Sequence, residues 1–245
     1  MSIAFGVHAV EAALKKSVVS ELWLDERQKP NQRLNNLLDL ANRVQVKIVR
    51  RPREALDQLA QGERHQGVLA HLTEQAAVAV KQEDLMSLLD ELDHPPFLLV
   101  LDGVTDPHNL GACLRSANAA GVDAVIVPKD NAVGITPVVR KVACGAAEVT
   151  PFYQVTNLAR TLRELQQAGV WLIGAAGETD DNIYQADLKG PLALVMGAEG
   201  KGMRRLTREH CDLLVKIPMV GTVESLNVSV ATGVCLFEAL RQRRA

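Results

Sequence analysis

Five short, almost uninterrupted apolar segments place the strongest limit on what this chain can fold into. They are FLLVLDG, AVIVP, VWLIG, LALVMG and DLLVKIP, at residues 97–103, 124–128, 170–174, 192–197 and 212–218. Helical patterns lie between them at 109–120 and 157–169 and follow the last one at 226–244. Strands without a polar face, alternating with helices, predict an α/β fold with a parallel sheet covered on both faces. The ligand site of such a sheet lies beyond the carboxyl ends of its strands.

The N-terminal part repeats this alternation on a smaller scale and differs in charge. Residues 1–72 carry 11 Lys and Arg against 8 Asp and Glu, whereas residues 73–96 carry 1 against 6 and close on two prolines. Residues 97–245 are balanced at 15 against 15. We therefore predict a small, basic α/β domain at 1–72, an acidic linker at 73–96 that includes a short amphipathic helix, and a larger α/β domain at 97–245.

Composition and cysteine spacing exclude several classes of protein. With 47% hydrophobic residues, 23% charged residues and a net charge of -2, the chain is globular and has no overall cationic surface. Its four cysteines lie far apart and no histidine stands at ligand spacing, so we expect neither a metal site nor a disulfide framework. We see no signal peptide and no apolar run near the roughly 18 residues that span a bilayer, and we expect a cytoplasmic protein.

The first candidate site segment follows the apolar strand that ends at Asp102. In LDGVTDPHNLGACLRSANAAG, Asn109 is placed to cap a helix, Gly111 permits a close backbone approach, and Arg115 projects from the helix six residues after Asn109. Taken alone, this segment is better explained as a well-capped helix with a surface arginine.

The second segment, LVMGAEGKGM at 194–203, has Gly197, Gly200 and Gly202 after a strand, with Glu199 among them. This pattern predicts a backbone loop around a ligand. The glycine order differs from the dinucleotide pattern G-x-G-x-x-G, and the chain has no G-x-x-x-x-G-K-[ST] phosphate loop. A nucleotide-sized ligand other than NAD fits best.

The third segment, IPMVGTVESLNVSVATG at 217–233, places Ser225, Asn227 and Ser229 at the start of the last helix. We expect its strand to end at 217–219 and Ser225 to serve as an N-cap. Capping alone does not explain so many small polar residues, so a functional site is the simpler interpretation. Aromatic residues make up only 3% of the chain, so any bound nucleic acid would be held mainly by charge and shape.

In order and spacing, Asn109-x-Gly111-x-x-x-Arg115 and the second and third segments resemble the three signature motifs of the SpoU/TrmH-type RNA 2′-O-ribose methyltransferases of the SPOUT superfamily. FGVHAVEAAL near the N-terminus and HQGVLA at 65–70 resemble that family's substrate-binding domain. The resemblance implies a SPOUT (α/β-knot) catalytic domain with a C-terminal trefoil knot. It also implies a preceding α/β domain that resembles ribosomal-protein-like RNA-binding folds.

The resemblance also implies a reaction and the residues that perform it. The reaction is methyl transfer from S-adenosylmethionine, without a metal, to the ribose 2′-hydroxyl of a guanosine in the peptidyl-transferase P loop of 23S ribosomal RNA, the position known as Gm2251. The family works as a homodimer. The implied catalytic residues are Asn109, Arg115, Glu199, Ser225 and Asn227. The implied cofactor-binding residues are Met196, Gly197, Gly200, Ile217, Met219, Ser225 and Leu226.

The residues themselves limit how this chemistry can work. Arg115 matches the family's essential arginine, but a guanidinium is effectively always protonated. We therefore expect Arg115 to bind the adjacent phosphate and stabilise the developing alkoxide rather than act as the general base. Three alternatives stay open: the same reaction on transfer RNA or another ribosomal nucleotide, a non-catalytic ribosome-assembly factor, and a dinucleotide-dependent oxidoreductase, which the glycine order disfavours.

Overall fold

The computed structural model describes residues 3–15, 18–29, 31–60, 65–73, 82–200 and 202–245. Residues 74–81 of the predicted linker and Lys201 of the second segment lie outside these ranges. The chain divides into two compact units, which we call unit 1 and unit 2. Unit 1 comprises Met1–Val78 and Ala143–Val149, and unit 2 comprises Ala79–Val142 and Thr150–Ala245.

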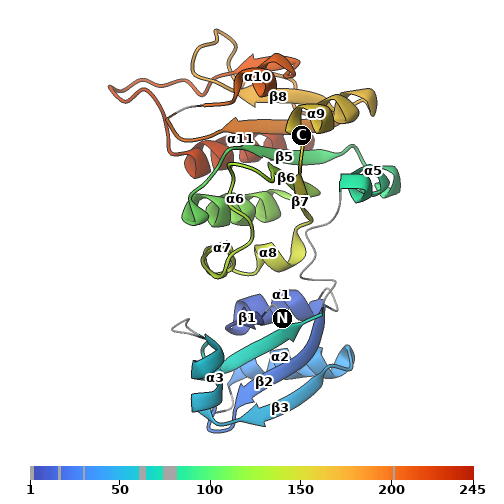
Figure 1. Ribbon diagram of the computed structural model, residues 1–245, viewed down its shortest axis with the longest axis vertical. Helices are drawn as coiled ribbons and strands as arrows, with labels where there is room; N and C mark the ends of the chain where they lie inside the picture. The colour runs from blue at the N-terminus through green and yellow to red at the C-terminus, as the bar shows by residue number, and fades with distance from the viewer. Residues whose placement is uncertain (1–2, 16–17, 30, 61–64, 74–81, 201) are drawn as a thin grey trace. The chain divides into compact units, whose positions relative to one another are not determined.

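Unit 1 contains a four-stranded mixed sheet with the strand order β1-β4-β2-β3 (Figure 1). Its elements up to β4 are β1 (Ile3–Phe5), α1 (Val7–Lys15), β2 (Val19–Asp25), α2 (Gln32–Arg43), β3 (Lys47–Arg51), α3 (Arg53–Ala60) and β4 (Val68–Leu72). Leu22 and Leu24 of β2 share one buried cluster with Leu14 of α1 and Leu37 of α2. Alternate residues of β2 therefore point into a core that α1 and α2 cover.

Unit 2 contains a six-stranded sheet with the order β10-β8-β9-β5-β6-β7, and every strand pair in it is parallel. The strands are β5 (Phe97–Asp102), β6 (Ala124–Pro128), β7 (Phe152–Val155), β8 (Trp171–Ala175), β9 (Leu192–Gly197) and β10 (Leu213–Val215). The helices after β4 are α5 (Gln82–Glu91), α6 (Pro107–Ala120), α7 (Pro137–Ala143), α8 (Ala146–Val149), α9 (Leu158–Gln167), α10 (Arg205–Glu209) and α11 (Val228–Arg243). Of these, α5 is the helix of the predicted linker, and α8 belongs to unit 1. The predicted parallel α/β sheet is confirmed.

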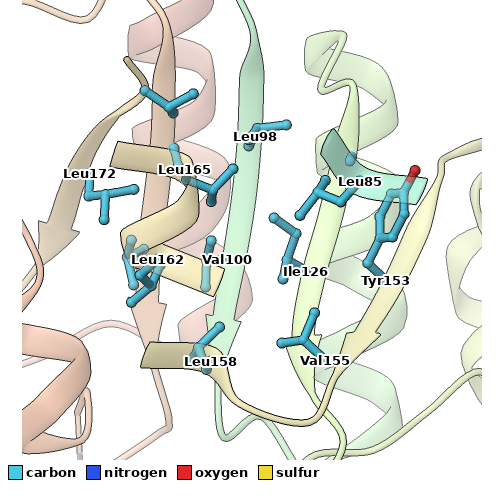
Figure 2. Close-up of a cluster of buried hydrophobic side chains, with 14 residues drawn as sticks. Leu85, Leu98, Val100, Ile126, Tyr153, Val155, Leu158, Leu162, Leu165 and Leu172 are labelled. Carbon is cyan, nitrogen blue, oxygen red and sulfur yellow. The ribbon is translucent and has the colours of Figure 1, made fainter. Parts of the chain in front are cut away.

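Both faces of the unit 2 sheet are covered, which explains its uninterrupted apolar strands. On one face, Leu98 and Val100 of β5 pack in a cluster with Leu162 of α9 and Leu85 of α5 (Figure 2). The alternate residues Leu99 and Leu101 are also fully buried, and α11 packs against both β9 and α6. Since side chains of the central strands are enclosed on both sides, the loops at the strand ends are where this sheet can bind a ligand.

Two element boundaries differ from the prediction for identifiable reasons. The helix after β5 begins at Pro107, and Asp106 caps it by accepting a hydrogen bond from the His108 backbone N–H at 2.9 Å. Proline suits the first helical position because it has no backbone N–H to leave unpaired. Asn109 therefore lies inside the helix rather than at its cap.

The end of the last strand and the cap of the last helix also differ from the prediction. β10 ends at Val215, before the predicted end at 217–219, and α11 is capped by Asn227 rather than Ser225. The segment between them is irregular, and apolar residues such as Ile217 extended the strand pattern into it. The elements β7, α7, α8 and α10 were not predicted, because they are short or lack a clear apolar period.

Candidate active site

The three candidate segments converge at one edge of the unit 2 sheet. The first follows β5 and the second follows β9, and these strands are direct neighbours in which Asp102 pairs with Gly197. The third leads into α11, which packs along α6. Segments about 90 and 118 residues from Asn109 in the chain thus come within hydrogen-bonding distance of it.

One side chain from each segment joins a single hydrogen-bonded cluster. The Asn109 Nδ2 donates to Glu199 Oε2 at 3.1 Å, and the Asn227 Nδ2 donates to Asn109 Oδ1 at 3.0 Å. A longer bond of 3.4 Å connects Asn227 Nδ2 with Glu199 Oε1. We call these three residues the amide–carboxylate cluster. Each of its members contacts the other two.

The cap of α11 fixes the orientation of this cluster. The Asn227 Oδ1 accepts from the Ser229 backbone N–H at 2.9 Å and from the Ser229 hydroxyl at 2.6 Å. With its oxygen committed to the helix, Asn227 must present its NH₂ group to Asn109 and Glu199. The same residue therefore satisfies a helix terminus and orients the Asn109 amide.

The glycine segment after β9 forms a tight loop that leaves no room for a side chain at Gly197. Ala198 and Gly202 exchange backbone hydrogen bonds of 3.0 and 2.9 Å across it. A Cβ on Gly197 would lie 2.2 Å from the Gly202 carbonyl carbon and from the Met203 nitrogen. Gly200 and Gly202 adopt φ values of +75° and +66°, a left-handed conformation that favours glycine. Glu199 thus sits in a loop that only glycine-rich sequence can form.

Gly111 serves packing rather than ligand contact. A Cβ at this position would lie 2.7 Å from Val142 Cβ and 2.9 Å from the Val139 carbonyl oxygen. The close backbone approach predicted for Gly111 is therefore to α7. A side chain at residue 111 would push the first turns of α6, which carry Asn109, away from α7.

The other predicted catalytic residues, Arg115 and Ser225, lie on α6 and just before α11. Arg115 is exposed on α6, six residues after Asn109. At 3.6 residues per turn, the Arg115 and Asn109 positions lie about 120° apart around the axis of α6. Ser225 is exposed and lies two residues before the cap of α11.

The predicted cofactor-binding residues differ in burial. Met196 is buried within β9, and Gly197, Ile217 and Leu226 are half-buried. Gly200 is exposed and Met219 is 37% exposed. Met196 and Gly197 end β9, and the other four residues lie in the segments that follow β9 and β10.

An ion pair at this edge was missed by the sequence analysis. Asp102, the last residue of β5, is 1% exposed and accepts two hydrogen bonds from Arg204, one from its backbone N–H at 2.8 Å and one from Nε at 2.6 Å. An acidic residue at the end of a fully apolar strand was the available signal, because a buried carboxylate requires a partner.

The site offers amides, carboxylates and backbone groups rather than a thiol nucleophile. Burial raises the pKa of Cys113 to about 11 and that of Cys235 to about 12. Burial, followed by the charge of Asp212, raises the pKa of Cys211 to about 12. These thiols stay protonated at neutral pH and are poor nucleophiles. Within the described ranges, no three His, Cys, Asp or Glu side chains are grouped to hold a metal ion, and no helix is long and apolar enough to cross a membrane.

Two family models match the chain. The model for the SpoU rRNA Methylase family matches residues 96–237, and the model for RNA 2′-O ribose methyltransferase substrate binding matches residues 3–77. Similar curated proteins include the 23S rRNA (guanosine-2′-O-)-methyltransferase RlmB of Shewanella oneidensis, 60% identical over 99% of this chain and 98% of the relative. The protein of the same name from Pseudomonas putida is 59% identical over 98% of this chain and 96% of that relative.

Solved structures resemble the whole chain as well. The SpoU methyltransferase AviRb of Streptomyces viridochromogenes, crystallised with the cofactor AdoMet, aligns with a TM-score of 0.80 at 25% identity, covering 99% of this chain and 90% of that one. A crystal structure of an RNA 2′-O ribose methyltransferase aligns with a TM-score of 0.77 at 26% identity, covering 99% and 89%.

Proposed function

The chain belongs to the SpoU rRNA methylase family, and we propose that it methylates the ribose 2′-hydroxyl of a guanosine in 23S ribosomal RNA, using S-adenosylmethionine as methyl donor. The single observation that carries the proposal is the amide–carboxylate cluster, because it joins one residue from each of the three motif segments. The target we propose is Gm2251 in the peptidyl-transferase P loop. The C-terminal trefoil knot also stays a prediction.

The two loops beside the cluster fit the proposed methyl donor. Space is open around Gly200, Gly202 and Gly221, where a Cβ would meet no atom within 4 Å. Half-buried Ile217 and Leu226 offer apolar surface at the same edge of the sheet. When bound, S-adenosylmethionine supplies an electrophilic sulfonium methyl group. We propose that Gly197 and Gly200, together with Met196, Met219 and Ser225, complete its site.

The remaining work falls to this chain's own residues. The ribose hydroxyl must be aligned with the methyl group and must lose a proton, so positioning and charge stabilisation are what the protein has to provide. We propose that Asn109, Glu199 and Asn227 orient the ribose, with Ser225 shaping the site. Arg115 then binds the neighbouring phosphate and stabilises the developing alkoxide, since its guanidinium carries a permanent positive charge.

Methyl transfer to defined RNAs tests the reaction and the substrate together. Unmodified 23S RNA and transfer RNA are incubated in parallel with methyl-labelled donor, and the alkali-resistant ribose is mapped. We expect label on one guanosine 2′-oxygen of the 23S RNA. Label on transfer RNA alone would retain the chemistry and overturn the substrate. No label on either RNA, or on ribosomal precursors, would favour the assembly-factor alternative.

Replacing Arg115 tests the assigned mechanism. We expect Arg115→Ala to lower methyl transfer by at least a hundredfold, because the variant loses the charge that stabilises the alkoxide. Donor binding, measured by calorimetry, should stay within about twofold of the unmodified chain. Arg160→Ala, which removes an exposed arginine paired with Glu164 on α9, is the control and should keep full activity. Near-normal turnover in Arg115→Ala would remove this residue from the mechanism.

We propose that the protein acts as a homodimer in the cytoplasm, with residues 1–72 selecting the RNA and residues 97–245 carrying the reaction. Val230 and Phe237 lie on one face of α11, seven residues apart, and are 52% and 49% exposed. An apolar face of this kind supports pairing with a second copy. Phe237→Glu should convert a dimer to a monomer in analytical ultracentrifugation, and a chain that is already monomeric would contradict the proposal.

A further inference from the structure

The buried ion pair between Asp102 and Arg204 stands apart from the three signature motifs. The side chain of Asp102 has no solvent exposure, whereas the side chain of Arg204 is 49% exposed. Both carboxylate oxygens are occupied, Oδ2 by the Arg204 backbone N–H and Oδ1 by its Nε. A carboxylate removed from water in this way depends on its partner, so Arg204 is held by its main chain and by its side chain at once.

The pair also encloses the loop that carries Glu199. Asp102 is aligned with Gly197 in the β5–β9 ladder, which fixes the start of the loop. Asp102 also binds Arg204, which is the last residue of the loop. Both ends of residues 197–204 are therefore fixed to one residue of β5, and Glu199 lies between them.

This loop needs such a restraint because its glycine-rich sequence makes its backbone flexible. Three of its residues are glycines, and two of those, Gly200 and Gly202, occupy left-handed conformations. Glycine has the largest backbone entropy to lose on ordering. Glu199 is exposed, and its carboxylate is bound by hydrogen bonds from Asn109 and Asn227. Its approach to Asn109 and Asn227 therefore depends on how the ends of the loop are fixed.

We propose that Asp102 and Arg204 are positioning residues for the active site. The pair holds the 197–204 loop in the conformation that brings Glu199 to the Asn109 and Asn227 amides, and that shapes the glycine backbone for the methyl donor. Neither residue contacts the reacting atoms in this assignment. The catalytic consequence rests on the proposed function, whereas the effect on the cluster itself does not.

Arg204→Ala tests this inference, with Arg205→Ala as a matched control. Arg205 is the next residue and forms an exposed pair with Glu209 at 2.7 Å on α10, outside the loop. Both variants remove one arginine, and only the first releases the loop. The direct readout is the side-chain NH₂ resonances of Asn109 and Asn227 in protein labelled with ¹⁵N-asparagine, because a merely structural role would not move them selectively.

In Arg204→Ala we expect both amide resonances to shift or broaden, and the affinity for S-adenosylmethionine to fall on the order of tenfold. Turnover at saturating donor and RNA should fall by a similar factor, because the cluster is ordered in only part of the population. Arg205→Ala should leave the resonances, the affinity and the turnover unchanged. Unchanged amide resonances in folded Arg204→Ala would overturn the inference.

Two further variants keep the test decisive if Arg204→Ala is unstable. Arg204→Lys retains the charge and the backbone donor, and should restore the amide resonances and most of the donor affinity. Asp102→Asn keeps the size of the side chain but turns one acceptor into a donor facing Nε. It should reproduce the Arg204→Ala resonance shifts, and combining it with Arg204→Ala should add little. Additive losses in the double variant would show that the two residues act separately.

The readouts also separate this inference from the proposed function. If the unmodified chain transfers no methyl group to RNA, the proposed function fails while the amide resonances still report on the loop. If it transfers methyl groups normally and Arg204→Ala matches Arg205→Ala in every readout, only the positioning role fails.

Discussion

The two sheets of this molecule are enclosed to different degrees. In unit 1, β2 alternates buried and more exposed residues before Asp25, with Leu22 and Leu24 buried and Ser20 exposed. In unit 2, every residue of β5 and β6 is buried. A mixed sheet with one well-covered face keeps the other partly accessible, whereas a parallel sheet between two helix layers is open only at its ends. The two units can therefore bind ligands at different places, unit 1 on a sheet face and unit 2 at the ends of its strands.

For unit 2 this means that binding and chemistry are confined to the loops at the carboxyl edge. The amide–carboxylate cluster and the 197–204 loop lie there. We therefore expect small changes at this edge to remove activity, and changes inside unit 1 to alter RNA selection while leaving donor binding intact. The predictions below test that division.

The largest effect is expected from Gly197→Ala. The added Cβ would meet backbone atoms of Gly202 and Met203 at 2.2 Å, and backbone cannot move aside as a flexible side chain does. The 197–204 loop must then open, so we expect donor binding to be undetectable and methyl transfer to fall at least a thousandfold. Calorimetry with S-adenosylmethionine and the transfer assay measure the two losses.

Gly190→Ala is the matched control for that substitution. It lies in the same unit, and a Cβ there would meet nothing within 4 Å. We expect its donor affinity and turnover to be normal. If Gly197→Ala binds the donor as well as Gly190→Ala does, the loop is not the binding element and the contrast between edge and sheet interior loses its main support.

Substitutions that create a cavity in the core of one unit should destabilise that unit alone. Leu22 of β2 and Leu98 of β5 are both fully buried, so either change to alanine should lower the free energy of unfolding of its own unit by about 2–5 kcal/mol. Scanning calorimetry with and without S-adenosylmethionine separates the units, because bound donor stabilises only the unit that holds it.

Leu98→Ala should lower the transition that the donor stabilises, whereas Leu22→Ala should leave that transition in place. At a temperature where Leu22→Ala has lost unit 1, donor binding should persist and transfer to 23S RNA should fall. Equal effects of both variants on the donor-stabilised transition would mean that the units do not unfold independently.

Much of the fold and of the candidate site could be predicted from the sequence. Uninterrupted apolar strands alternating with helices predicted the parallel sheet, and the resemblance of the motif segments predicted which residues belong together. Asn109, Glu199 and Asn227 do meet, because strand order brings the ends of β5 and β9 side by side and α11 packs on α6.

The sequence pattern could not show which polar side chain forms a hydrogen bond with which backbone group. Asp106 rather than Asn109 caps α6, since proline at the next position fixes the helix start. Nothing in the local sequence distinguishes Arg243 from other arginines near the C-terminus, yet its guanidinium donates to the carbonyl oxygens of Pro95, Leu188 and Gly190. Such partners depend on tertiary contacts between distant segments, which leave no local period in the sequence.

A third prediction uses the cysteines to test how tightly the helix layers cover the unit 2 sheet. Cys113 of α6 and Cys235 of α11 are buried, whereas Cys144 is exposed. Because burial raises the pKa values of Cys113 and Cys235 to about 11 and 12, their thiolate fractions at pH 8 are very small. Iodoacetamide should therefore modify Cys144 first, and all four thiols only after unfolding. Peptide mass spectrometry over time measures the order, and early modification of Cys113 would contradict a closed helix layer.

The smallest expected effect concerns the C-terminal end of α11. Hydrogen bonds from Arg241 and then from Gln242 lower the pKa of Glu238 to about 2, from an ordinary value of 4.5. A carboxyl whose pKa is lower in the folded state adds stability above the unfolded value, and that stability disappears as the pH falls from about 4.5 toward 2. Gln242 also connects α11 to the segment before β9, because its Oε1 accepts from the Leu188 backbone N–H at 3.0 Å.

Glu238→Gln should therefore be slightly less stable than the unmodified chain at pH 7, and this difference should shrink below pH 4.5. Thermal unfolding of both chains between pH 7 and pH 3 measures the trend. A difference that is constant with pH would mean that the Glu238 side chain contributes by packing under the sheet rather than by its charge. In that case the C-terminal end of α11 would be stabilised by packing, as the interior of unit 2 is. Polar interactions would then matter mainly in the loops around Asn109 and Glu199.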